Sequence, residues 1–265
     1  MEPIKVAVNG ALGKMGGQIL SSLSRYPELE PVGGVDIKAE EDRLALSYGP
    51  GLIPLSTDLE AIIQHTHPQV VVDFSNAEGV LALARTATSH KVHLVIGTSG
   101  VTPDQLQELD QVSRANGVGC VVAPNFALGA VLMIHLAQIA GRFFDYADII
   151  ELHHEQKVDA PSGTALATAR AMVQARGGPF KYEPTQQQNW PQTRGGELQG
   201  IGLHSVRLPG LVAHQEVIFG GLGQTLSIRH DSVSRDSFIP GVVLAIKEVV
   251  KRQGLIYGLD KLLNL

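Results

Sequence analysis

The sequence is poor in cysteine and has no long hydrophobic run. Its one cysteine, Cys120, cannot form a disulfide within the chain, and the apolar stretch around it, GVGCVVAP, predicts a buried small side chain. No apolar run reaches the roughly 18 residues of a membrane span. The first residues, MEPIKVAVNG, lack the basic start and the cleavage site of a signal peptide. We therefore expect a soluble, cytoplasmic protein.

Clusters of like charge are also missing. Charged residues make up 18% of the 265 residues and the net charge is −5, with no basic run and no basic amphipathic helix. We therefore expect neither a nucleic-acid partner nor a membrane partner. The hydrophobic fraction of 44% is enough for a full core, in one large domain or two smaller ones.

The first half of the chain alternates short apolar runs with helical patterns. Five apolar runs are expected to be strands, at residues 4–8, 31–35, 70–74, 92–96 and 119–123. One of the helices between them is predicted to begin with Thr102 as its N-cap and Pro103 in its first turn. Strands that are apolar on both faces and separated by helices indicate a parallel sheet covered on both sides.

The pattern changes after Asn125. The expected elements there are helices at 129–141, 164–176 and 240–251, and strands at 147–153, 202–207, 213–219 and 224–230. The last three strands alternate polar and apolar residues, which predicts an antiparallel meander. Residues 177–200 are rich in Gly, Gln and Pro and are expected to form a long loop.

These patterns predict an α/β fold class with two domains. The first is a Rossmann-like dinucleotide-binding domain of residues 1–124 and 236–265, to which the last helix returns. The second is an α+β domain of residues 125–235 with a mixed, largely antiparallel sheet.

A glycine-rich loop follows the first expected strand. In VAVNGALGKMGG the glycines are Gly10, Gly13 and Gly16, at the start of a helix. They would let backbone N–H groups approach a pyrophosphate at the positive end of that helix. Leu12 departs from the usual G-x-G-x-x-G spacing, and glycines that serve only packing in an ordinary turn are the alternative.

The residues near this loop leave the choice of dinucleotide open. Asp36 ends the second expected strand, where a carboxylate would accept the ribose hydroxyls of NAD and repel a 2′-phosphate. Lys14 and Lys38 would pair with that phosphate, which favours NADP. The expected cofactor is therefore NADPH, NADH or both.

Three further loops follow expected strands. They are Phe74-Ser75-Asn76, Gly97-Thr98-Ser99-Gly100 and Ala123-Pro124-Asn125-Phe126. Ligands of such sheets bind beyond the carboxyl ends of the strands, so three small polar loops at that edge favour a cofactor cleft. Ordinary turn chemistry would explain any one of them alone.

The stretch ELHHEQKVDAPSGTA combines two histidines, a lysine and the start of a helix. His153 or His154 can supply a proton near neutral pH, and Lys157 adds a positive charge. Gly163 and Thr164 would offer backbone N–H groups and a hydroxyl to an anion at the start of the helix. This grouping suits the reduction of a small carboxylate substrate.

Two other interpretations of the histidines apply. Zinc-protease spacing requires His-Glu-x-x-His, but His154-Glu155-Gln156-Lys157 ends in lysine, so we expect no metal. Adjacent histidines on a strand point to opposite faces, and either one alone is also compatible with a purely structural role.

The same stretch carries a family resemblance. The chain resembles the 4-hydroxy-tetrahydrodipicolinate reductase family, also called dihydrodipicolinate reductase, of the diaminopimelate route to lysine. The matching segments span nearly the whole chain and are VNGALGKMG, DFSNAEGV, VIGTSG, APNFALGAV, ELHHEQKVDAPSGTA and GLHSVRLPGLVAHQEVIFGG. The resemblance implies NAD(P)H-dependent reduction of 4-hydroxy-tetrahydrodipicolinate to tetrahydrodipicolinate with loss of water.

The resemblance also implies roles for individual residues. His153 would be the proton donor and Lys157 a second catalytic cation, with the substrate carboxylates bound by His154, Gly163 and Thr164. The implied cofactor contacts are Gly10, Ala11, Leu12, Gly13, Lys14, Met15, Asp36, Lys38, Gly97, Thr98, Ser99, Ala123, Pro124, Asn125 and Phe126. Some members carry arginine at the position of Ile37, which leaves Lys14 and Lys38 as the 2′-phosphate partners here.

The resemblance also implies an oligomeric state, because the family is generally a homotetramer assembled through the sheet of the second domain.

Two other function classes remain as alternatives. One is another two-domain nicotinamide oxidoreductase, such as a semialdehyde or homoserine dehydrogenase, for which Cys120 is poorly placed inside a strand. The other is a catalytically silent dinucleotide-binding regulator, against which the His153 and Lys157 pair argues.

Overall fold

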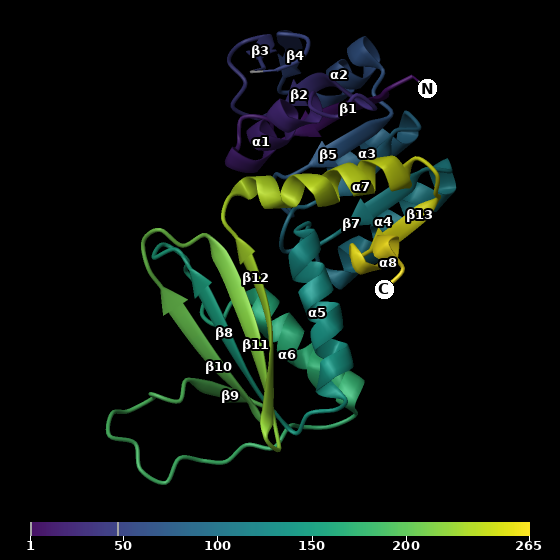
Figure 1. The fold of residues 1–265 in the computed structure, drawn as a ribbon. Helices are drawn as coiled ribbons and strands as arrows, with labels where there is room; N and C mark the ends of the chain where they lie inside the picture. Colours follow the sequence, from purple (N-terminus) through teal and green to yellow (C-terminus); the bar gives the residue numbers. More distant parts are fainter. Residues whose placement is uncertain (1, 47) are drawn as a thin grey trace. The chain divides into compact units, whose positions relative to one another are not determined.

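A computed structural model describes residues 2–46 and 48–265 (Figure 1). The chain divides into two compact units, which are described separately below. Unit 1 comprises residues 1–127 and 238–265, and unit 2 comprises residues 128–237. Within the described residues, no helix has the length and apolar character needed to cross a membrane.

Unit 1 contains a sheet with the strand order β13-β7-β6-β5-β1-β2-β4-β3. The strands are β1 (Ile4–Asn9), β2 (Leu29–Val35), β3 (Arg43–Ala45), β4 (Leu52–Ser56), β5 (Val70–Asp73), β6 (His93–Ile96), β7 (Gly119–Val122) and β13 (Gly254–Tyr257). Neighbouring strands are parallel except for β3, which pairs antiparallel with β4 at one edge. All five strands expected in the first half are present, and β3, β4 and β13 were not predicted.

Helices cover both faces of this sheet. They are α1 (Lys14–Leu23), α2 (Leu59–Thr66), α3 (Val80–Ser89), α4 (Pro103–Asn116), α7 (Ile239–Val249) and the short α8 (Asp260–Leu263). α1 packs with α7 on one face, and α2, α3 and α4 form a row on the other. Thr102 caps α4 as expected, and Gln105 completes a capping box with it.

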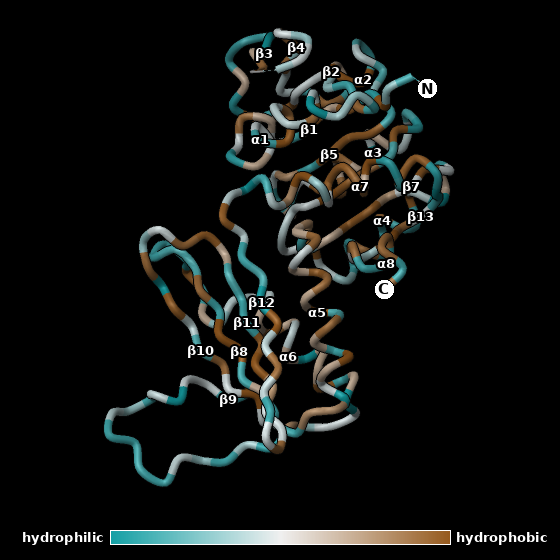
Figure 2. The backbone as a smooth tube through the Cα atoms, in the orientation of Figure 1, coloured by the Kyte–Doolittle hydropathy of each residue, from teal (hydrophilic) through white to brown (hydrophobic). Residues whose placement is uncertain are grey.

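Burial explains why the central strands are so apolar. β5 and β7 are buried at every residue, because helices take both faces away from water. These strands form brown segments through the middle of unit 1 in Figure 2. Cys120 lies inside β7 and is fully buried, as expected from its apolar surroundings.

Unit 2 is a smaller sheet covered by two helices. Its elements are α5 (Leu128–Gly141), β8 (Tyr146–His153), α6 (Gly163–Arg176), β9 (Gly196–Leu198), β10 (Ile201–Arg207), β11 (Ala213–Gly221) and β12 (Gln224–Ser232), followed by a 3₁₀ turn (Arg235–Phe238). The strand order is β12-β11-β8-β10-β9. The mixed, largely antiparallel sheet is confirmed, since only β8 and β10 pair in parallel.

The predicted three-strand meander is wrong. β11 and β12 form an antiparallel hairpin, but β10 and β11 are not neighbours, because β8 lies between them and pairs with both. The turn at Pro209-Gly210 therefore leads across β8 instead of closing a hairpin. The segment expected to be all loop also contains β9, beside β10.

The core of unit 2 lies between this sheet and its helices. α5 and α6 pack together and cover one face, where Ile149, Val217 and Phe219 are fully buried against Met172 of α6. Along β8, side chains alternate between the two faces, and Glu151 and His153 follow Ile149 on the helix-covered face. A carboxylate and an imidazole thus continue a row of core side chains.

Candidate functional site

The carboxyl ends of the unit 1 strands lie side by side. Asn9 of β1 pairs with Val35 of β2 and with Asp73 of β5, and Asp73 pairs with Ile96 of β6. The strand order reverses between β1 and β5, which is where open α/β sheets bind ligands. The loops singled out in the sequence therefore share one edge of the sheet.

The glycine loop lies tightly packed at this edge. Gly10 has a positive φ of 78°, and a Cβ there would lie 2.9 Å from the carbonyl oxygen of Phe74. A Cβ on Gly16 would overlap the Gly10 carbonyl, so both positions require glycine. The following helix, α1, begins at Gly13 without a side-chain cap and without an acidic residue in its first turn. Its positive end is therefore left for an anion.

Asp36 fixes the shape of this loop. Its carboxylate is buried and accepts hydrogen bonds from the backbone N–H groups of Leu12 at 2.9 Å and Lys38 at 3.0 Å. One carboxylate thus holds the end of β2 to the glycine loop. Each oxygen keeps a further lone pair, which is compatible with a hydroxyl ligand.

Asp73 joins three of the edge loops. Its fully buried carboxylate accepts hydrogen bonds from the Asn9 amide at 2.7 Å, the Ser75 hydroxyl at 2.6 Å and the Thr98 hydroxyl at 2.7 Å. The Thr98 hydroxyl in turn accepts from the Ser75 backbone N–H at 3.1 Å. A buried carboxylate satisfied in this way holds the ends of β1, β5 and β6 in one arrangement.

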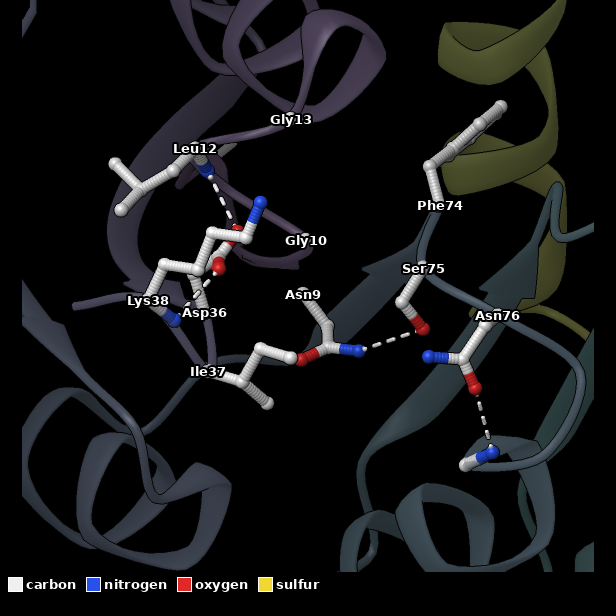
Figure 3. A pocket seen from close by; sticks show the side chains of 11 residues that line it. Asn9, Gly10, Leu12, Gly13, Asp36, Ile37, Lys38, Phe74, Ser75 and Asn76 are labelled. Carbon is white, nitrogen blue, oxygen red and sulfur yellow. Dashed lines mark hydrogen bonds between the residues drawn. The ribbon is translucent and has the colours of Figure 1, made fainter.

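A cavity of about 390 Å³ opens among these loops (Figure 3). It is lined by Asn9, Gly10, Leu12, Gly13, Asp36, Ile37, Lys38, Phe74, Ser75, Asn76 and Gly79. Figure 3 shows the glycine loop and Asp36 on one side of it and the Phe74–Asn76 loop on the other. The structure thus brings together Gly10, Leu12, Gly13, Asp36 and Lys38 from the predicted cofactor set.

The other predicted cofactor residues do not line this cavity. Ala11 is buried under the loop, while Lys14 and Met15 occupy the first turn of α1, with Lys14 exposed. Thr98 is buried through its bond to Asp73, between Gly97 and the exposed Ser99. In the last loop, which runs Ala123-Pro124-Asn125-Phe126, the Phe126 ring packs 5.6 Å from that of Phe74.

In unit 2, His153 has a buried carboxylate partner. Its Nδ1 lies 2.5 Å from an oxygen of Glu151, two residues earlier on the same face of β8. Glu151 is 1% exposed. Burial lowers the pKa of His153, and Glu151 opposes that shift by stabilising the charged ring.

Arg207 holds the same carboxylate from the neighbouring strand. Its two terminal nitrogens donate to the two oxygens of Glu151 at 2.9 and 2.7 Å, in the bidentate arrangement of a strong ion pair. Burial raises the pKa of Glu151, but hydrogen bonds from Arg207, Ser205 and His153 outweigh it and lower the pKa overall. Glu151 is therefore an ionised carboxylate that is buried on the helix-covered face of the sheet.

The remaining predicted residues of the cluster follow β8. The ammonium of Lys157 donates to the Asp159 carboxylate at 2.6 Å, and the Lys157 backbone N–H closes a turn onto the His154 carbonyl. His154 itself is exposed. Gly163 and Thr164 form the first turn of α6, which Ser162 caps through its side chain. The cluster predicted from the sequence is thus gathered at one end of β8, beside the start of α6.

Several residues of both sites escaped the sequence analysis. Asn9 and Asp73 end strands whose other residues are apolar, and that position was their only signal. Glu151 had a clearer one, because it occupies a core-facing position in an alternating strand. Arg207 had none, since its place beside Glu151 depends on the parallel pairing of β10 with β8.

Comparison with known proteins decides the family. The model of the dihydrodipicolinate reductase N-terminus matches residues 4–126, and that of its C-terminus matches residues 129–263. The chain belongs to the dihydrodipicolinate reductase family. It is 54% identical over 265 residues, all of both chains, to the 4-hydroxy-tetrahydrodipicolinate reductase of Dehalococcoides mccartyi. It is 47% identical to that of Moorella thermoacetica over 98% of each chain.

A solved member of the dihydrodipicolinate reductase family has the same fold. The dipicolinate-bound enzyme of Paenisporosarcina sp. TG-14 superposes with a TM-score of 0.87 at 39% identity, over 98% of this chain and 99% of that one. Family membership makes this chain an oxidoreductase and removes the alternative of a silent regulator. Cys120 is fully buried inside β7, and burial raises the pKa of its thiol to about 12, so it does not fit the accessible cysteine nucleophile of an acylating dehydrogenase.

Proposed function

We propose that the chain reduces 4-hydroxy-tetrahydrodipicolinate to tetrahydrodipicolinate with loss of water, in the diaminopimelate route to lysine. The observation that carries this proposal is the group of His153, Lys157 and the start of α6, found in a chain that matches the reductase family from end to end. Unit 1 would bind the dinucleotide and unit 2 the substrate. Such a reaction of small metabolites belongs in the cytoplasm.

A nicotinamide dinucleotide fits the residues of unit 1. The uncapped start of α1 suits the pyrophosphate, and Gly10 and Gly16 permit the tight packing of the loop that leads into it. Asp36 would accept the ribose hydroxyls of NADH, and the Lys38 side chain, which lines the same cavity, would pair with the 2′-phosphate of NADPH. We infer that the site accepts both dinucleotides. When bound, the cofactor supplies the hydride.

The residues of unit 2 fit a small dicarboxylate. Lys157 would contribute positive charge and the exposed His154 a hydrogen-bond donor. The backbone N–H groups of Gly163 and Thr164 lie in the first turn of α6, where carboxylates bind favourably. His153 would deliver the proton that accompanies the hydride, directly or through an ordered water molecule. Glu151 holds the ring through its contact with Nδ1, so the other ring nitrogen, Nε2, would transfer the proton.

A coupled assay tests the function. The product of dihydrodipicolinate synthase is supplied to the full-length protein, and the absorbance of NADH or NADPH is followed over time. We expect oxidation of both dinucleotides that depends on the synthase product. No turnover with either dinucleotide would exclude the proposed reaction.

We also propose that the chain forms a homotetramer through the uncovered face of the unit 2 sheet. The face opposite α5 and α6 carries Ile150, Leu152 and Ile218, which are only partly buried in the single chain. Burying an apolar sheet face against a second copy is favourable. Sedimentation analysis is expected to give the mass of four chains, and a monomer at micromolar concentration would contradict this assembly.

A further inference from the structure

We propose that Glu151 and Arg207 form a buried positioning pair. Glu151 fixes the tautomer of His153, and Arg207 links Glu151 to the backbone of Asp159, whose side chain holds Lys157. This inference rests on the proposed role of His153 as proton donor. Glu151 and Arg207 belong to neither the predicted nor the proposed contact set. Their role follows from three features of unit 2, namely their burial, their bidentate contact and their links to both catalytic candidates.

The first feature is the placement of Glu151. It occupies a core-facing position of β8, at 1% exposure, between the packed Ile149 and His153. An ionised carboxylate at such a position is costly unless hydrogen bonds satisfy it. It accepts from Arg207, from His153 and, at 3.3 Å, from the backbone N–H of Ser162 at the start of α6. A purely structural position would be filled at lower cost by an apolar residue.

The second feature is the direction of the His153 contact. Because the carboxylate is ionised and only accepts, the proton between the two groups belongs on Nδ1 of His153. The neutral ring then has a lone pair on Nε2, and the charged ring has a transferable proton there. Orientation of a proton-transferring histidine by a buried carboxylate is a general way to select one ring nitrogen.

The third feature is that Arg207 contacts the partners of both catalytic candidates, His153 and Lys157. Besides its two bonds to Glu151, it donates to the backbone carbonyl of Asp159 at 2.8 Å. The side chain of Asp159 holds the ammonium of Lys157. One guanidinium thus fixes the carboxylate behind His153 and the backbone that carries the partner of Lys157. A lysine at position 207 would lack the planar fork for this arrangement.

The charges around His153 determine the expected pH response. The groups that face it are Glu151 on its own strand, Arg207 on β10, and Lys157 with Asp159 in the following loop. On β11, Ala213 lies opposite His153 and Gln215 opposite Glu151, and Ser162, the N-cap of α6, donates to Glu151; all three are neutral. Glu151 is the neighbour that raises the pKa of His153, whereas Arg207 and Lys157 lower it. Removing the carboxylate charge must therefore lower the pKa of His153 further.

Nitrogen NMR of the full-length protein, labelled at histidine, tests the tautomer directly. The His153 signals are assigned by their loss in His153→Gln. We expect the neutral ring to carry its proton on Nδ1, and a neutral ring protonated on Nε2 would overturn the proposal. The measurement needs no catalytic turnover, so it remains decisive even if the proposed reaction proves wrong.

The variant Glu151→Gln tests the functional consequence. We expect kcat to fall by roughly 10- to 100-fold, by analogy with the loss of a carboxylate that orients a metal-bound histidine. The alkaline limb of kcat/KM and the His153 titration should both move to lower pH, and Glu151→Asp should restore part of each. Asp145→Asn, which removes a carboxylate paired with Arg176 elsewhere in unit 2, is the control and should change neither. A lower kcat with an unmoved limb and titration would mean that Glu151 acts only structurally, and would overturn the proposal.

Discussion

The carboxylate of Asp36 and the backbone N–H of Leu12 form a hydrogen bond of 2.9 Å that joins the end of β2 to the glycine loop. The position of Asp36 at the end of β2 predicts that its carboxylate accepts the ribose hydroxyls of a dinucleotide. The structure shows that the same carboxylate also shapes the loop that would hold the pyrophosphate. Both roles would favour binding of the same dinucleotide, because a loop that is already held in place loses less conformational entropy when a ligand binds.

Replacing Asp36 should therefore weaken binding of both dinucleotides. We expect Asp36→Ala to raise the Kd of NADH about tenfold or more, equivalent to roughly 1.4 kcal/mol, since it removes a hydroxyl acceptor and releases the loop. Asp36→Asn keeps one acceptor oxygen and should have a smaller effect. Fluorescence titration of each dinucleotide measures both. Unchanged Kd values in the alanine variant would remove Asp36 from the cofactor site.

Lys38 should distinguish the two dinucleotides. Its side chain lines the cavity, whereas the exposed Lys14 lies in the first turn of α1 outside it. We expect Lys38→Ala to raise the KM for NADPH more than that for NADH, because only NADPH offers a 2′-phosphate. Lys14→Ala is the matched comparison, and its ratio of the two KM values should change less. Equal effects of Lys38→Ala on both would exclude contact with the phosphate.

Asp73 is expected to matter for stability as well as for binding. Asp73→Ala would leave the buried Thr98 hydroxyl without its acceptor, at a cost of about 1–3 kcal/mol for an unsatisfied group, and would leave the Asn9 amide with only the Ser75 hydroxyl as acceptor. We therefore expect a clear drop in the free energy of unfolding, measured by urea titration. Ser75→Ala removes a donor and leaves the carboxylate with its other partners, so its loss should be near 1 kcal/mol. Similar losses in both variants would show that the carboxylate does not organise this edge.

The contrast between units shows what local pattern can predict. In unit 1, the five central strands are apolar runs and the candidate ligand loops follow them directly, so these loops were predictable from the sequence. The bonds through which Asn9 and Asp73 join the loops were not, because they depend on which strands are neighbours. In unit 2, the pattern predicted strands but not their neighbours. Nothing in residues 202–207 reveals that β8, some 50 residues earlier, inserts beside them and separates β10 from β11.

The same limit applies to the candidate catalytic cluster. His153, Lys157 and the start of α6 are close in sequence, and the stretch that holds them was recognisable at once. Arg207 reaches Glu151 only through the parallel register of β10 with β8, in which Arg207 lies beside His153. The strands β9 and β3 are only three residues long and mostly exposed, so they also lack the apolar run on which strand prediction depends.

Substitutions of His153 and His154 should affect different kinetic constants. His153→Gln removes the proposed proton donor and should lower kcat by roughly 10²–10⁴, the usual contribution of acid–base catalysis. His154→Gln removes only a proposed carboxylate contact, so it should mainly raise the KM of the substrate. Full activity of His153→Gln would assign the proton to another group.

The pH profile adds a second criterion for the same histidine. Burial lowers the pKa of His153 from its ordinary value of 6.5, with Glu151 opposing. The charged ring is the donor, so kcat/KM should be highest below this pKa and decline as the pH rises through it. The midpoint should lie below 6.5, because kcat/KM reports the pKa of the free enzyme. His154→Gln should keep this limb and His153→Gln should lose it, whereas a limb that survives in His153→Gln belongs to a different acid.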